Sequence, residues 1–222
     1  MPVRNIKKKH KIMKKILAIK IVLSVVVAIT IIAFSVIVVT PQTWLYRRLY
    51  TKQNMEETTG VSVFEASLNY DGIIEQILGR QKVQGMTTYD SSAGLLGRIM
   101  ELRTIYSVCR YICGFGMIIV IVSILLLKDK KWYHCLNFGG LGAIGLSLLA
   151  TGIAGLIRPL RLFVFKSDYA ELFGNDPKFT MLIPDGLMLY YWLIALFFIF
   201  VIGFIFALVH LESRTDYTPH KF

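Results

Sequence analysis

Four long runs of apolar residues constrain the fold of this chain more than any other feature. They cover residues 16–39, 105–127, 136–157 and 187–210 and contain almost no charged side chains. A helix of about 20 residues reaches across a hydrocarbon core of about 30 Å, whereas a water-soluble helix of that length carries a polar face. Because a backbone in hydrocarbon must satisfy its own hydrogen bonds, each run is predicted to be a transmembrane helix.

The positions of Lys and Arg predict the orientation of these helices. Basic side chains are concentrated in residues 1–15 and 128–135, and such segments remain in the cytoplasm. We therefore expect residues 1–15, 128–135 and 211–222, and both chain ends with them, to be cytoplasmic. Residues 40–104 and 158–186 are expected outside a bacterial cytoplasmic membrane. The first run exceeds the apolar length of a signal peptide, so it is expected to be an uncleaved anchor.

The net charge of +11 is then mainly a consequence of topology. The basic N-terminus is expected to meet the anionic lipids of the inner leaflet, and no nucleic-acid partner is predicted. Aromatic side chains near the expected membrane boundaries are predicted to be interface anchors. These side chains are Trp44, Tyr46, Tyr50, Trp132, Tyr133, Tyr190, Tyr191 and Trp192.

The segment 40–104 is predicted to form a small, mainly helical domain. Ser62 and Glu65 have the spacing of a capping box, and the apolar stripe that follows at helical spacing stops at Gly79. Residues 80–90 are polar and are expected to be extended or to form a short hairpin. Ser91 or Ser92 then caps an amphipathic helix that continues into the second run. The segment 158–186 is predicted to be an amphipathic loop on the outer leaflet.

The residue types available outside the membrane limit the chemistry. All four histidines, His10, His134, His210 and His220, fall at the expected cytoplasmic side, and the outer segments hold no cysteine. A Ser-His-Asp or Cys-His arrangement is therefore excluded there. No histidine accompanies the cysteines in the outer half of the membrane, so we expect neither a metal site nor a cofactor.

Arginines and carboxylates remain as candidate binding residues. Arg98, Glu101 and Arg103 precede the second run, and Arg110 lies inside it, where a charge is costly and often functional. Such groups suit a phospholipid head group or a free amino terminus. The third run carries Gly139, Gly140, Gly142, Gly145, Gly152 and Gly155. Small residues at this spacing allow helices to approach closely, within this chain or against a membrane protein partner.

Several short motifs of the outer segments resemble the lipoprotein intramolecular transacylase (Lit) family of bacteria. In the first segment they are Glu57-Thr58-Thr59-Gly60-Val61-Ser62, Asn69-Tyr70-Asp71, Ile74, Leu78, Ser91-Ser92-Ala93-Gly94-Leu95 and Glu101-Leu102-Arg103. In the second they are Glu171-Leu172-Phe173, Asp176-Pro177 and Leu182-Ile183-Pro184-Asp185. The resemblance implies four crossings, an outer domain between the first two, and transfer of an acyl chain onto the amino-terminal cysteine of a lipoprotein.

The resemblance also implies outer histidines, and this chain departs from it there. The two expected positions fall at or beside Arg98 and near Ala170. Arginine cannot accept the proton of an attacking amine. Glu101 then remains as a weak candidate for the catalytic base. The leading hypothesis is a Lit-like protein that binds a lipid or lipoprotein through Arg98, Glu101, Arg103 and Arg110 without this chemistry. An active transacylase that makes lyso-form lipoprotein, and an accessory four-helix subunit of a transporter or sensor, are the alternatives.

Overall fold

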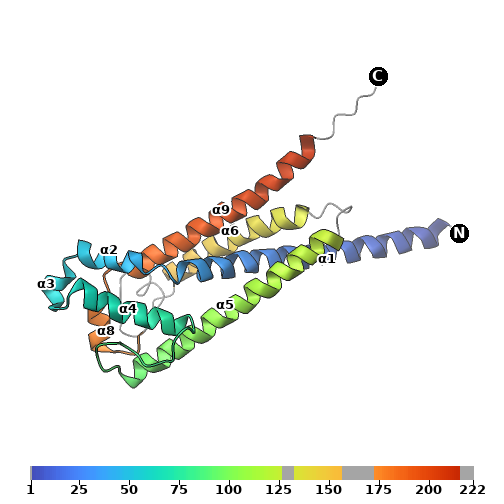
Figure 1. Cartoon of the computed structure of the whole chain (residues 1–222). Helices are drawn as coiled ribbons and strands as arrows, with labels where there is room; N and C mark the ends of the chain where they lie inside the picture. Colours follow the sequence, from blue (N-terminus) through green and yellow to red (C-terminus); the bar gives the residue numbers. More distant parts are fainter. Residues whose placement is uncertain (1, 127–132, 157–172, 216–222) are drawn as a thin grey trace. The chain divides into compact units, whose positions relative to one another are not determined.

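The structure, a computed structural model, describes residues 2–126, 133–156 and 173–215, and every regular element in these ranges is a helix (Figure 1). The long helices are α1 (Pro2–Val39), α5 (Ala93–Leu126), α6 (Tyr133–Leu156) and α9 (Leu187–Thr215). The short ones are α2 (Trp44–Lys52), α3 (Met55–Thr59), α4 (Val63–Ile77) and α8 (Pro177–Leu182). The prediction of an all-helical protein is confirmed.

Four stretches of these helices are long and apolar enough to cross a bilayer, as the apolar runs predict. They are Lys14–Val39, Ala93–Val122, His134–Leu156 and Leu187–Leu208. The second begins earlier than the apolar run because the amphipathic helix expected after Ser92 is continuous with it. The side of the membrane on which each connecting segment lies stays a prediction, and most of the predicted outer loop 158–186 lies outside the described residues.

The chain divides into two compact units. The first, here called the bundle unit, comprises Met1–Ala33, Ile112–Leu148 and Phe198–Phe222. The second, here called the insert unit, comprises Phe34–Tyr111 and Leu149–Phe197 and contains α2, α3, α4 and α8. Each unit has its own cluster of buried apolar side chains.

Glycines hold the helices of the bundle unit close together. A Cβ at Gly139 would lie 2.5 Å from Val27 of α1, and a Cβ at Gly140 would lie 2.6 Å from the carbonyl oxygen of Gly203 in α9. The part of α6 in this unit therefore packs against both α1 and α9, which confirms the predicted packing role for these two glycines. No atom lies within 4 Å of a Cβ built at Gly145, farther along α6.

The insert unit is built around stacked tyrosines. The ring of Tyr46 in α2 lies parallel to that of Tyr70 in α4, with centroids 4.0 Å apart. The Tyr46 hydroxyl donates to the carbonyl of Leu182, and the Tyr50 hydroxyl donates to that of Val61. Because Tyr46 and Tyr50 are only 1% and 0% exposed, the prediction that they anchor the chain in the membrane interface is wrong. Their phenols find hydrogen-bond partners inside the protein, so they can join its core.

The predicted ends of α4 are confirmed. The Ser62 hydroxyl accepts the backbone N–H of Glu65 at 3.2 Å, which is the N-capping contact expected from their spacing. The helix ends at Ile77, and Gly79 follows with a φ of +77°. A left-handed conformation at this point costs glycine little and terminates the helix.

Residues 80–92 form bends and irregular backbone instead of the hairpin considered from the sequence, because their backbone pairs with side chains of α4. The amide oxygen of Gln76 accepts the N–H groups of Gln84 and Gly85, and its Nε2 donates to the carbonyl of Gly85. Asn69 makes the same kind of contact with Thr88. Two buried amide side chains therefore replace a β ladder.

A buried carboxylate joins the beginnings of α5 and α8. One oxygen of Asp176 accepts the N–H of Ser92 at 2.8 Å, and the other accepts the N–H of Phe179 at 2.9 Å. The Ser92 hydroxyl itself accepts the N–H of Leu95, which confirms the cap predicted at this position. Burial acts to raise the pKa of Asp176, but the hydrogen bonds from Phe179 and Ser92 outweigh it and hold that pKa below the usual value.

Replacement of Gly140 by alanine is expected to destabilise the protein, because its Cβ would meet the backbone of Gly203. Overpacking of this kind costs about 1–3 kcal/mol. Gly145→Ala is the matched control on the same helix and should leave stability unchanged. Thermal unfolding of the two variants in detergent tests the difference, and equal melting temperatures would contradict it.

Acidification should weaken the junction at Asp176. Its carboxylate has a lowered pKa in the folded protein, so its contribution to stability is present above the ordinary value of 3.8 and is lost as the pH falls through the folded value. The Asp176→Asn variant should be less stable at neutral pH and should show a flatter decline in melting temperature from about pH 5 downward. A decline as steep as that of the parent protein would count against this role.

Candidate functional site

The sequence-predicted binding residues all lie on α5, but the helix separates them into two faces. Arg98 and Glu101 form an ion pair, with Nη1 and Oε2 2.5 Å apart and both side chains largely exposed. At 3.6 residues per turn, Arg98 and Arg103 point about 140° apart around the helix axis. The fully buried residues Leu95 and Ile99 occupy the stripe between them. The structure therefore does not gather the four side chains into one cluster.

Arg103 is held against the end of α4. Its Nη1 donates to the carbonyl of Gln81 at 3.3 Å, and its Nε lies 3.6 Å from a Cβ built at Gly79. Gly79 thus ends α4 next to this guanidinium. Arg103 has one fixed contact with the protein and keeps other N–H groups for a ligand.

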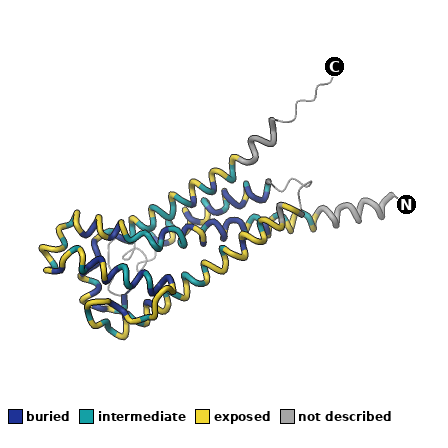
Figure 2. Tube along the Cα trace, in the orientation of Figure 1, coloured by how far each residue is buried: buried dark blue, intermediate teal, exposed yellow. Residues whose placement is uncertain are grey.

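Arg110 lies seven residues after Arg103 and so on the same side of α5. Together with Ser107 and Tyr111 it lines a cavity of about 180 Å³. Arg110 and Tyr111 are exposed on a helix that is otherwise apolar enough to span a bilayer. The exposed surface of α5 is visible as the yellow stretches along this helix in Figure 2. An arginine beside a small cavity in such a helix is suited to the polar part of a lipid-anchored ligand.

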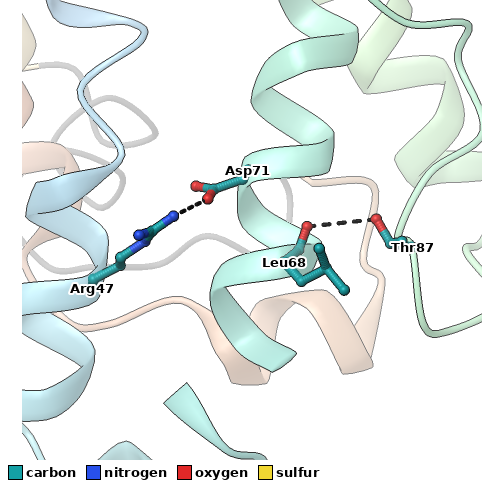
Figure 3. Close-up of polar contacts among 4 residues, drawn as sticks. All are labelled: Arg47, Leu68, Asp71 and Thr87. Atoms are coloured by element: carbon teal, nitrogen blue, oxygen red, sulfur yellow. Dashed lines mark hydrogen bonds and ion pairs between the residues drawn. The ribbon is translucent and has the colours of Figure 1, made fainter. Parts of the chain in front are cut away.

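A second polar cluster, which the sequence reasoning missed, lies between α2 and α4. Arg47 of α2 forms an ion pair with Oδ2 of Asp71 in α4 (Figure 3). The other carboxylate oxygen of Asp71 and the hydroxyl of Ser67 are buried and have no hydrogen-bond partner in the described part of the chain. The four-residue spacing of Ser67 and Asp71 was the available signal, but a polar pair on a helix usually marks its solvent side.

Tyrosine hydroxyls connect this cluster to α9. The Tyr70 hydroxyl donates to that of Tyr191 at 3.1 Å, and the Tyr191 hydroxyl donates to the carbonyl of Gln42 at 2.8 Å. Burial, followed by the neighbouring Tyr191, raises the pKa of Tyr70 well above its usual value. Burial likewise raises the pKa of Tyr46. These phenols therefore stay protonated at neutral pH and act as hydrogen-bond donors instead of bases.

Histidine is not available as a general base in the insert unit. The sequence of this unit contains no histidine, and the Glu101 carboxylate is paired with an arginine on its own helix. No group of three or more His, Cys, Asp or Glu side chains in the described ranges is arranged to hold a metal ion. The arrangement offers N–H donors on α5 and unpartnered acceptors on α4, which suits recognition of a polar ligand.

Comparison with known families and solved structures identifies proteins with the same fold. The family described as lipoprotein intramolecular transacylase Lit matches residues 21–177, and a search of curated proteins gives no match. Solved structures of the membrane integral transacylase Lit from Bacillus cereus match with a TM-score of 0.75. One, at 20% identity, covers 90% of this chain and 95% of its own.

Two further matches are variants of the same Bacillus cereus protein. A histidine-to-arginine variant, 19% identical, covers 97% of this chain and all of its own chain. A histidine-to-alanine variant, 20% identical, covers 96% of this chain and all of its own. At this identity the likeness establishes the fold.

The exposed pair of Arg98 and Glu101 is expected to contribute little to stability. Exposed ion pairs on a helix are worth about 0.5 kcal/mol or less. Glu101→Gln should therefore leave the melting temperature of the purified protein within about 2 °C of the parent. This variant then reports on ligand binding alone, and a large drop in melting temperature would show that Glu101 has a structural role.

Proposed function

Because the chain belongs to the Lit family of lipoprotein intramolecular transacylases, we propose that it binds a lipoprotein or membrane lipid at the outer leaflet, without histidine-based acyl transfer. The observation that carries this proposal is the exposed Arg110 beside a cavity on an otherwise apolar helix. An acylated ligand fits this surface, because it presents apolar chains to the helix and polar groups to Arg110.

The surface of α5 matches such a ligand in chemistry. Exposed apolar side chains, among them Met100, Ile105 and Val108, alternate with the polar residues of the predicted site. Acyl chains pack along the apolar surface, while Arg103 and Arg110 donate hydrogen bonds to phosphate or ester carbonyl oxygens. Arg98 and Glu101 add a charged pair at the beginning of the helix.

The lack of a histidine in the insert unit argues against histidine-based transfer. Acylation of an amine requires a base that removes its proton, and Arg98 stands where the family resemblance expects a histidine. An arginine remains protonated and cannot act in this way. One matched Bacillus cereus structure contains an arginine in place of a histidine, which supports the view that such a replacement is compatible with the fold.

One specific observation favours each of two other functions. An active transacylase would use the exposed Glu101 as its base and produce lyso-form lipoprotein. An accessory subunit would dock through α6, where a Cβ at Gly145, Gly152 or Gly155 meets no atom of the described chain within 4 Å. The first alternative predicts a chemical product, and the second predicts a stable complex in mild detergent.

Mass spectrometry of lipoprotein amino termini separates binding from transfer. The protein is expressed in a bacterial strain without N-acylating enzymes, and the acyl chains on the amino-terminal cysteine are located. We expect only the diacylglyceryl form with a free amine. The appearance of lyso-form product, and its loss in Glu101→Gln, would replace this proposal by the active transacylase.

Binding itself is tested with a synthetic diacylglyceryl lipopeptide and the protein in nanodiscs. Arg103→Met and Arg110→Met should each weaken binding by about tenfold, since each removes charge-assisted hydrogen bonds worth about 1.4 kcal/mol. Arg48→Met, which removes an exposed arginine of α2 in the same unit, is the matched control and should bind like the parent. Equal affinity of all three variants would contradict the assignment of the site to α5.

A further inference from the structure

Two buried oxygens of neighbouring side chains on α4 have no hydrogen-bond partner. Ser67 is only 6% exposed, and both its Oγ and the Oδ1 of Asp71 are unpartnered in the described part of the chain. Residues four apart on a helix lie one above the other, with Cβ atoms roughly 6 Å apart. Buried polar atoms are nearly always paired, because an unpaired one keeps the cost of leaving water. The two acceptors therefore lie on the same face of α4, and both lack a donor in the described part of the chain.

The contacts around Asp71 hold its free oxygen in place. Arg47 binds Oδ2 from α2 (Figure 3), so the carboxylate is not free to turn Oδ1 toward solvent. On the other side of α4, the Thr87 hydroxyl donates to the carbonyl of Leu68 at 3.5 Å. Tyr46 and Tyr70, stacked between α2 and α4, fix the spacing of the two helices. The two acceptors thus belong to a preorganised part of the insert unit.

The chemistry of the two oxygens selects the ligand. An ionised aspartate only accepts hydrogen bonds, and a serine hydroxyl accepts as well as donates. A phosphate or carboxylate would be repelled by Asp71, and a hard divalent cation takes six or more oxygen ligands, which this pair does not offer. A primary amine carries several N–H donors on one atom and satisfies both oxygens at once.

We propose that Ser67 and Asp71 form a binding site for the primary amine of a lipid-anchored ligand. Two sources share this chemistry: the free amino terminus of a diacylglyceryl lipoprotein and the head group of an aminophospholipid. The inference rests on the proposed function in that it takes the ligand to be lipid-anchored, and it adds which group of that ligand is recognised. Both Asp71 and Glu101 pair with an arginine, but Asp71 is the less exposed of the two, so less water competes with an amine there.

The test measures discrimination between amine and amide. A diacylglyceryl lipopeptide with a free amino terminus and its N-acetylated form are titrated onto the protein in nanodiscs of phosphatidylcholine and phosphatidylglycerol. The free amine should bind about tenfold more tightly. Ser67→Ala and Asp71→Asn should abolish the preference and leave the affinity for the acetylated peptide unchanged.

Glu75→Gln is the matched control for this experiment. Glu75 is also a carboxylate of α4 and also pairs with an arginine, Arg80, at 2.8 Å. Its side chain is 33% exposed, against 29% for Asp71. The control variant should keep the full preference, and a loss of preference in it equal to that in Asp71→Asn would overturn the site by showing that any charge on α4 has the same effect.

A second arm distinguishes the two sources of the amine. Phosphatidylethanolamine replaces phosphatidylcholine in the nanodisc, and competition with the free lipopeptide is measured. Competition that Ser67→Ala removes supports the site and identifies the aminophospholipid as a ligand. Absence of competition, with the lipopeptide preference intact, supports the site and identifies the amino terminus as the ligand.

The melting temperature distinguishes a site that binds an amine from a site that holds a structural water molecule. Ser67→Ala removes an unpaired buried hydroxyl, so the melting temperature of the free protein should stay equal or rise. A lower melting temperature together with an intact amine preference overturns the proposal. Failure of either lipopeptide to bind the parent protein overturns the proposed function as well, whereas equal binding of both peptides overturns the amine site alone.

Discussion

The cost of an unsatisfied backbone hydrogen bond in hydrocarbon governs this structure. Four stretches of the chain meet that cost by forming continuous helices long enough to cross a bilayer. Between lipid-exposed helices the hydrophobic effect supplies little attraction, so close contact depends on small residues. Gly139 and Gly140 provide it in the bundle unit, where α6 approaches α1 and α9 at backbone distance.

In the insert unit, side chains instead of a β ladder form the hydrogen bonds of backbone groups outside the helices. Gln76 pairs with the turn at Gln84 and Gly85, and Asp176 pairs with the first N–H groups of α5 and α8. Against this thorough pairing, the unpartnered oxygens of Ser67 and Asp71 are exceptional. The proposed amine ligand would supply a donor to each of them.

The helix α5 links the fold to the proposed function. Its first turns are fixed in the insert unit by Asp176 and by the buried Leu95 and Ile99. This fixed beginning determines where Arg103 and Arg110 emerge on the exposed surface. In the proposal the ligand is a lipoprotein or membrane lipid, and the absence of histidine from the insert-unit sequence separates recognition from catalysis.

The sequence alone determined the four membrane helices, the cap at Ser62, the stop at Gly79 and the Lit resemblance, because each depends on a local run or spacing of residues. The tertiary structure determined which side chains are buried and which are paired, because no local pattern contains that information. It placed Tyr46 and Tyr50 in the core, since a phenol is equally suited to a membrane interface and to an interior with hydrogen-bond acceptors. It also put Arg98 and Arg103 on different faces of α5, buried Ser67, and paired Asp71 with Arg47 of α2. Burial and pairing depend on which helix packs on which face, and that is settled only when segments distant in sequence come together.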